Sequence, residues 1–248
     1  MNHIRLGQPL IQLQSVDSTN TYAAQLIRNS EATEGTAILT VYQSMGKGHG
    51  GNRWISEAGR NLLFSVILKP EFILAERHFF LSMCVSGAIQ EFIMSVAGPV
   101  HIKWPNDILL QGKKVAGILI ENTILKQNLH TSVIGVGLNV NQTEFPADLP
   151  NPTSLALAAG REFDLSESLN LLLRSLEVHI DRLYEERYAE IKTFYLNHLH
   201  RLNKWADYTD STGAFRGRIV DIADSGNLIV IKENGKERQY GFKEIAFN

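Results

Sequence analysis

The chain has 248 residues, 44% of them hydrophobic and 20% charged, a composition typical of a folded globular protein and unlike that of disordered or low-complexity chains. Its 24 basic and 26 acidic residues give a formal net charge of −2. No general positive field is therefore available for sequence-independent binding of DNA, and any anion site must be local.

The sequence carries few signals of location. The single cysteine, Cys84, lies in an apolar stretch, which predicts a buried thiol and a reducing compartment. The segment Met1 to Arg5 lacks the apolar part of a signal peptide. The most apolar region, residues 79–102, is interrupted by Glu91 and by Gly98-Pro99. We therefore expect no membrane span and a cytoplasmic protein.

The first 140 residues are predicted to contain both helices and strands. Ser18 or Thr19 can cap a short helix, because apolar residues then recur at helical spacing. The stretch 44–60 is too rich in glycine for a regular element and long enough to suggest a function. Around it we expect strands at 36–43 and 61–68, a helix at 74–97, and strands at 100–104, 108–110, 115–120 and 132–140.

The remainder of the chain changes in character. Apolar residues keep a helical face from residue 166 to about residue 205. Beyond it, short strands at 215–222, 228–232 and 238–245 are separated by turns rich in glycine and asparagine. We therefore expect a larger domain over residues 1–207 and a small β-barrel over residues 208–248.

The glycine-rich stretch begins with Gly46-Lys47-Gly48-His49-Gly50-Gly51, which formally matches a dinucleotide-binding fingerprint. That fingerprint needs a helix after the glycines, whereas a strand follows here, so the match is rejected. Bare backbone N–H groups together with Lys47, His49 and Arg53 can still surround an anion. The alternative is a mobile surface loop.

Two further motifs suggest chemistry. In Lys103-Trp104-Pro105-Asn106-Asp107, a lysine at a strand end is held beside a rigid pair and can meet a developing charge. A solvated lysine beside a core tryptophan is the alternative. In Gly135-Val136-Gly137-Leu138-Asn139-Val140-Asn141, glycines alternate within a strand, which is typical of close approach by a ligand or of tight packing.

In this order, and together with Ser15-Val16-Asp17-Ser18-Thr19-Asn20 and Val115-Ala116-Gly117-Ile118-Leu119-Ile120-Glu121, these motifs resemble the biotin protein ligases over roughly residues 10–160. The resemblance implies an α+β fold, with a mixed sheet and helices like those of class II aminoacyl-tRNA synthetases, and an SH3-like β-barrel at the C-terminus. It also implies a reaction in two steps. Biotin and MgATP give biotinyl-5′-AMP, and a lysine of a biotin carboxyl carrier domain then takes the biotin.

The resemblance also assigns site residues. Lys103 and Lys47 are the expected catalytic groups, because cations offset repulsion between a carboxylate and a phosphate. The expected biotin-binding residues are Ser18, Thr19, Asn20, Gln43, Gly46, Gly48, Lys103, Gly135 and Gly137. The expected ATP or adenylate contacts are Lys47, His49, Arg53, Trp54 and Asn139. No carboxylate cage for a metal is evident, so Mg²⁺ is expected to arrive with ATP.

The chain departs from the family pattern within the glycine-rich loop. Many members read G-R-G-R-x-G-R, whereas Lys47, His49 and Asn52 stand at the three arginine positions. Lysine keeps the charge but loses the bidentate fork, and histidine is mostly neutral near pH 7. Our hypothesis is that backbone amides and Lys47 close the loop, with Arg53 or Arg60 adding charge, and that the intermediate is held more loosely.

Other functions stay open at this point. A lipoate or octanoate ligase would share the fold, but its acyl chain would leave the polar Ser18-Thr19-Asn20 set unpaired at ~1–3 kcal/mol per buried group. A non-catalytic biotin-binding module is the second alternative. Only about fifteen residues precede the first motif, too few for a helix-turn-helix domain, so we expect a short form without DNA binding. We expect a monomer or a homodimer.

Overall fold

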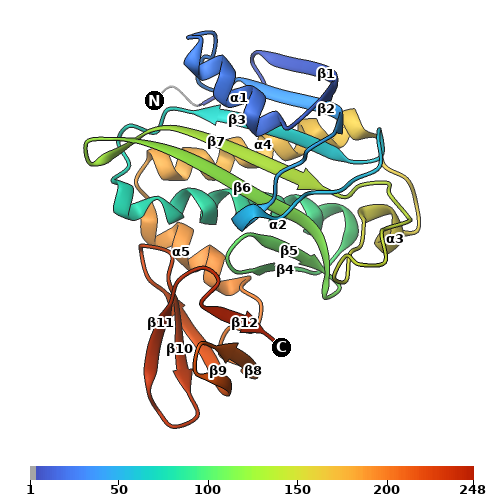
Figure 1. The fold of residues 1–248 in the computed structure, drawn as a ribbon. Helices are drawn as coiled ribbons and strands as arrows, with labels where there is room; N and C mark the ends of the chain where they lie inside the picture. The colour runs from blue at the N-terminus through green and yellow to red at the C-terminus, as the bar shows by residue number, and fades with distance from the viewer. Residues whose placement is uncertain (1–3) are drawn as a thin grey trace.

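The computed structural model describes residues 4–248, so the part of the signal-peptide prediction that falls on residues 1–3 lies outside it. Its centre is a seven-stranded sheet with the order β1-β2-β3-β7-β6-β5-β4 (Figure 1). The edge strand β1 runs parallel to β2, and the other neighbours are antiparallel. The strands are β1 (Leu10–Val16), β2 (Ala37–Gln43), β3 (Leu62–Leu68), β4 (Val100–Lys103), β5 (Asp107–Leu110), β6 (Lys113–Leu125) and β7 (Asn128–Leu138).

Helices cover both faces of this sheet. On one face, α1 (Thr19–Arg28) packs Ala23 and Leu26 onto the strands. On the other face lie α2 (Phe79–Ala97), α4 (Leu165–Tyr184) and α5 (Tyr188–Asn197), which share the main core (Figure 1). A short helix, α3 (Leu155–Ala159), follows the proline-containing connection after β7. The mixed sheet with its helices confirms the predicted α+β class.

The central helix α2 is apolar around most of its circumference. The segment Ala75–Ala97 has a mean hydropathy of 1.5, and its length and composition would allow it to cross a membrane. Glu91 lies within this segment and Gly98-Pro99 follows it, so neither interruption shortens it. However, 72% of its apolar 18-residue stretch is buried inside the fold, as expected for a helix between a sheet and other helices. Cys84 on this helix is fully buried, as predicted, and burial raises the pKa of its thiol.

A second sheet follows the helices, with five antiparallel strands in the order β11-β10-β9-β8-β12. They are β8 (Trp205–Asp210), β9 (Gly213–Ile222), β10 (Leu228–Lys232), β11 (Glu237–Tyr240) and β12 (Ile245–Phe247). This order describes an open sheet within residues 4–248, so the predicted closed barrel is not confirmed. The division at residues 207 and 208 stays a prediction, and β8 begins at Trp205.

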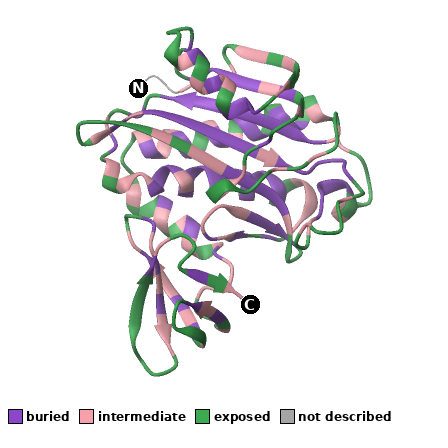
Figure 2. Cartoon of the chain, in the orientation of Figure 1, coloured by how far each residue is buried: buried purple, intermediate pink, exposed green. Residues whose placement is uncertain are grey.

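The two sheets share one apolar cluster. It includes Phe64 of the central sheet and Tyr208 of the second sheet, and Trp104 Nε1 donates 2.8 Å to the carbonyl of Gly226 in the β9–β10 turn. Figure 2 shows buried residues along the central strands and helices, while the outer strand β11 of the second sheet is largely exposed. The second sheet is therefore docked against the end of the first.

Several boundaries differ from the sequence-based predictions. Strands β1 and β8 were not predicted, because polar residues interrupt both of them and few of their side chains are buried. The helical face predicted from residue 166 to 205 breaks at Glu185–Arg187 and ends at Asn197. The strand predicted at 238–245 is two strands, separated by a turn in which Lys243 has a φ of +66°.

Candidate active site

A cavity of about 330 Å³ opens where the glycine-rich loop, the end of β2, the β4–β5 connection and the segment 242–247 meet. It collects residues separated by more than two hundred positions. Of the predicted site residues, it is lined by Ser18, Thr19, Asn20, Gln43, Lys47, Gly48, His49, Arg53, Trp54, Lys103, Gly135 and Gly137. Gly46 and Asn139 do not line it.

One end of the cavity is a hydrogen-bonded polar cluster at the start of α1. Both the backbone N–H and the hydroxyl of Thr19 donate to Gln43 Oε1, at 2.8 and 3.2 Å. Ser65 Oγ lies 2.7 Å from both Thr19 Oγ1 and Asn20 Oδ1. The Asn20 amide donates 2.7 Å to Glu121 Oε2. These side chains are therefore oriented by three strands as well as by the helix.

Ser18 precedes the helix and was expected to cap it. It does occupy the cap position, but its side chain makes no capping hydrogen bond. Ser18 is only 2% exposed, and within residues 4–248 its hydroxyl has no protein partner, so it faces the cavity with its hydrogen-bonding capacity free. A buried polar group without a partner costs free energy unless a ligand or water satisfies it.

The alternating glycines of β7 make room for two side chains. A Cβ on Gly135 would overlap Asn20, and a Cβ on Gly137 would overlap the indole of Trp54. On the paired strand β6, a Cβ on Gly117 would stand 2.8 Å from the same indole. Tight packing by side chains therefore explains these glycines, and the packed side chains form the cavity floor.

The glycine-rich loop is a narrow hairpin whose two arms are joined by backbone hydrogen bonds. Trp54 N–H donates to the Gly46 carbonyl at 2.9 Å, and Gly48 N–H donates to the Asn52 carbonyl at 2.7 Å. A Cβ on Gly46 would stand 2.5 Å from the Trp54 carbonyl oxygen, so Gly46 allows the two arms to approach. The tip, His49–Gly51, is a single turn of three-ten helix.

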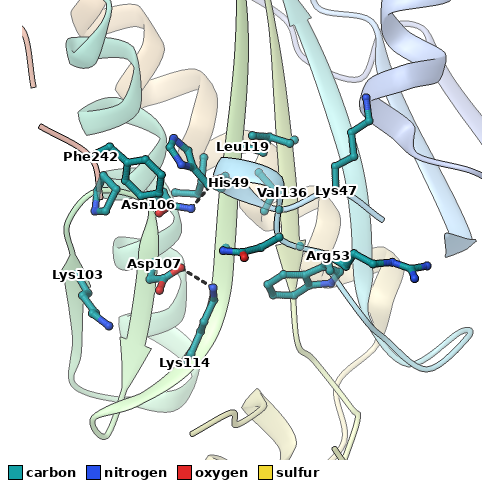
Figure 3. Close-up of a pocket in the computed structure, with 18 of the residues that line it drawn as sticks. Lys47, His49, Arg53, Lys103, Asn106, Asp107, Lys114, Leu119, Val136 and Phe242 are labelled. Carbon is teal, nitrogen blue, oxygen red and sulfur yellow. Dashed lines mark hydrogen bonds and ion pairs between the residues drawn. The ribbon is translucent and has the colours of Figure 1, made fainter. Parts of the chain in front are cut away.

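The cations of the cavity have different surroundings. Lys114 Nζ lies 2.6 Å from Asp107 Oδ1, whereas Lys103 Nζ lies 5.5 Å from the centre of the Phe247 ring and within residues 4–248 has no ion pair. Figure 3 shows Lys47 and Arg53 extending away from the group formed by the other labelled residues. Within residues 4–248, Lys103 is therefore a cation of the cavity wall that has no ion pair and can meet an anion.

The histidine of the loop and the distant arginine do not supply that charge. Burial and then the ammonium of Lys243 lower the pKa of His49 from its usual 6.5, against a smaller opposing effect of Asp107. Arg60 donates to the Asn141 carbonyl and forms an ion pair with Glu162 at 2.7 Å, and it does not line the cavity. The suggested contribution of Arg60 thus finds no support in its position.

A second cavity, of about 360 Å³, adjoins the first and shares Arg53, Trp54 and Lys114 with it. Asn139 lines it, together with Phe145, Leu149 and two prolines. The Asn139 amide donates 2.9 Å to the Thr153 carbonyl, but its Oδ1 is buried without a partner in the described chain. An apolar slot with one unpaired acceptor can take a flat ligand that carries an N–H donor.

The first cavity does not fit a metal held by the protein. Asp107 is the only carboxylate among its lining residues, and it is paired with Lys114. Within residues 4–248, no group of three metal-ligating side chains is close enough to hold an ion. A divalent cation at this site would have to be held by the phosphates of a ligand.

Several residues of the site were not assigned by sequence reasoning. Ser65, which contacts Thr19 and Asn20 behind the cavity wall, lies in a strand that reads as uniformly buried, and the lining residue Lys114 precedes the motif that was used. Phe242, Lys243, Ile245, Ala246 and Phe247 line the cavity from the second sheet. No local pattern in the sequence could place that segment beside the loop, because the contact depends on how the two sheets dock.

Comparison with known proteins gives two family matches. Residues 12–139 match the biotin/lipoate A/B protein ligase family, and residues 209–246 match the biotin protein ligase C-terminal domain. The bifunctional ligase/repressor BirA of Bacillus subtilis is 32% identical, over 95% of this chain and 73% of that protein. The biotin–[acetyl-CoA-carboxylase] ligase of Paracoccus denitrificans is 30% identical, over 91% of this chain and 95% of that protein.

A similar architecture is found among solved structures. The biotin protein ligase of Aquifex aeolicus in complex with biotin and ATP matches 96% of this chain and 98% of that chain, with a TM-score of 0.75 and 28% identity. The match is long enough to include both sheets and the cavity between them.

Proposed function

The chain belongs to the biotin/lipoate A/B protein ligase family and carries a biotin protein ligase C-terminal domain, and on this basis we propose that its cavity joins biotin to ATP and passes the biotin to a protein lysine. The protein is an ATP-dependent biotin ligase that forms biotinyl-5′-AMP. One observation carries the assignment of the site. A polar cluster suited to a cyclic urea and a free lysine suited to an acyl phosphate lie on the walls of one cavity beneath a glycine-rich loop.

We assign the ureido ring of biotin to the polar end of the cavity. A cyclic urea offers one acceptor and two donors, so it needs both donors and acceptors from the protein. The free hydroxyl of Ser18 and the oriented side chains of Thr19, Asn20 and Gln43 supply these. An aliphatic acyl chain would leave the Ser18 hydroxyl unpaired, which disfavours octanoate at this site.

Lys103 is the residue we assign to the first chemical step. A carboxylate oxygen of biotin forms a bond to the α-phosphorus of ATP, and the bond from that phosphorus to the pyrophosphate oxygen breaks. Two anions must approach each other for this to occur. An ammonium held near both reduces their repulsion, and it does so most in a cavity that excludes water.

The second step needs no covalent enzyme intermediate. The neutral amine of a carrier lysine bonds to the acyl carbon of biotinyl-5′-AMP, AMP leaves with the electron pair, and the amine releases a proton. We assign the adenine to the cavity behind Trp54, where the unpaired Asn139 Oδ1 can accept from an adenine amino group. Mg²⁺ comes with the ATP phosphates.

The carrier is a biotin carboxyl carrier domain of a carboxylase, which is the substrate class that the family implies. Our expectation that the protein works in the cytoplasm agrees with an ATP-dependent reaction and a buried thiol. The absence of DNA binding and the choice between monomer and homodimer stay predictions. Gel-shift titration with DNA and sedimentation with and without biotin would test them.

The function is tested by exchange of labelled pyrophosphate into ATP, with biotin, lipoate, octanoate or no acid present. We expect exchange with biotin alone. Exchange with lipoate or octanoate would transfer the chain to the related acyl ligases, and exchange with none of the acids would favour a non-catalytic biotin-binding module.

Lys103→Ala should lower the biotin-dependent exchange by about 100-fold or more, the typical cost of removing a group that stabilises developing charge. Lys113→Ala is the matched control, because Lys113 is exposed at the start of β6 and does not line the cavity. Far-ultraviolet circular dichroism should be the same for both variants. Exchange by Lys103→Ala at the parent rate would remove Lys103 from the mechanism.

A further inference from the structure

The tip of the glycine-rich loop is held by the turn between β11 and β12. Lys243 Nζ donates to the Gly50 carbonyl at 2.6 Å, and the Phe242 ring meets the His49 ring edge-on, with centroids 3.9 Å apart. The hydrogen bond joins residues 193 positions apart in the chain. The loop over the cavity is thus fastened from the second sheet as well as from its own neck.

Gly50 and Lys243 both have a positive φ, and this backbone conformation allows the contact. Gly50 has a φ of +67°, and a Cβ there would stand 2.6 Å from Lys243 Cε and 2.7 Å from Phe242 Cε1. Lys243 itself has a φ of +66°, in a region that favours glycine over residues with a side chain. This backbone conformation places the Lys243 side chain against the tip of the loop.

The other charged groups around the cavity have surroundings that differ from those of Lys243. Lys47 and Arg53 extend away from the group formed by the other labelled residues (Figure 3), Lys114 is paired with Asp107, and the pKa of His49 is lowered. Lys243 lines the cavity, and within the described chain no carboxylate lies within ion-pair distance of it. Its side-chain hydrogen bond goes to the carbonyl of Gly50 at the tip of the loop.

We propose that Phe242 and Lys243 form a latch that holds the glycine-rich loop closed over the acyl phosphate, with Lys243 as a positioning residue. This inference rests on the proposed function, since the group retained beneath the loop is biotinyl-5′-AMP. The latch helps to keep the loop closed in a chain that has Lys47, His49 and Asn52 at the three arginine positions of the family pattern. Holding the loop from the second sheet slows its opening, and so slows loss of the intermediate to water.

The test is Lys243→Gly, compared with Lys243→Arg. Glycine removes the ammonium and at the same time suits the positive φ, so the variant should be at least as stable to heat as the parent protein. Release of preformed biotinyl-5′-AMP, measured by filtration in the absence of a carrier, should become about tenfold faster, the usual effect of losing one hydrogen bond from a charged donor. Arginine should restore slow release.

Lys236→Gly is the matched control, because Lys236 is an exposed lysine of the same sheet that does not line the cavity. It should release the intermediate at the parent rate. A second measurement needs no ligand: Lys243→Gly should increase the rate at which trypsin cleaves after Lys47 and Arg53. Parent-like release together with parent-like cleavage would overturn the latch.

The two measurements also separate the latch from the proposed function. If the parent forms no biotinyl-5′-AMP but trypsin cleaves the glycine variant faster, the latch holds and the assigned reaction fails. If the parent forms the intermediate and neither readout moves, the reaction holds and the latch fails.

Discussion

Asn20 shows how a single side chain can be fixed by residues from several elements. Its Oδ1 occupies the space in which a Cβ on Gly135 would stand, and its amide donates to Glu121. Ser65 contacts it from β3. The orientation of Asn20 is therefore set before a ligand arrives, and a ligand loses less entropy when its partners are already ordered.

Gly135→Ala should weaken biotin binding by about tenfold or more, because the added methyl group displaces Asn20 from the cavity floor. Overpacking of this kind costs ~1–3 kcal/mol of stability as well. Isothermal titration with biotin would measure the first effect and urea unfolding the second. A variant with unchanged biotin affinity would show that Asn20 does not need its present position.

A second residue-scale effect concerns pH. Burial, followed by the charges of Arg201, His101, Lys103 and Lys204, lowers the pKa of His200 from 6.5 to about 4. Between these values the unfolded chain binds a proton that the folded protein does not. The free energy of unfolding should therefore fall as the pH is lowered from about 6.5 toward 4.

His200→Gln should make that decline shallower. At pH 7.5, where the histidine is neutral in the folded and the unfolded protein, protonation of His200 should make no difference to the stability of the two proteins. Urea unfolding at several pH values would measure it, with the partly exposed His130 as the control position for the same substitution. His49 and His179 also have lowered pKa values, so part of the slope should persist. Identical slopes in the parent and His200→Gln would contradict the assignment.

At the scale of elements, the β4–β5 connection of the central sheet makes a hydrogen bond to the second sheet. It places Lys103 on the cavity wall and, one residue later, directs the Trp104 indole to the Gly226 carbonyl. Gly226 has a φ of +92°, and a Cβ there would overlap the space of Phe79. A single short connection therefore links the position of the catalytic lysine to the docking of the second sheet.

Trp104→Phe should destabilise the protein by ~1–3 kcal/mol, because the Gly226 carbonyl loses its donor in a buried place. The matched control is Trp205→Phe. Trp205 is 44% exposed, so its replacement should change stability by less than about 0.5 kcal/mol. Urea unfolding followed by circular dichroism would compare them. Equal effects of the two substitutions would show that the hydrogen bond does not hold the sheets together.

The sequence predicted those features that depend on residues close together in the chain, and it missed those that depend on contacts between separate segments. The helix after Ser18 and the strand at 36–43 were predictable because their apolar spacing is local. The cavity residues in the loop and at Lys103 were found through motifs. The hairpin form of the loop was missed, because its cross-strand bonds, such as Gly48 to Asn52, leave no periodic pattern in a run of glycines.

At the scale of the whole molecule, the docking of two sheets decided what remained unpredicted. Phe242, Lys243 and Ile245 line the first cavity from the second sheet and its turns, and none of them was predicted as a site residue. Phe242 and Lys243 lie beside the loop only because the second sheet shares an apolar core with the first. Contacts of this kind depend on packing between distant segments, which periodicity and composition do not encode.

The meeting of the loop with the segment 242–247 also orders events during protein synthesis. A ribosome that adds ~5–20 residues per second makes Trp54 on the order of ten seconds before it makes Phe242. Throughout that interval the hairpin has no partner at its tip and the cavity has one wall missing. A nascent chain can therefore fold its central strands early, but it gains a closed reaction chamber only when the second sheet has been made and docked.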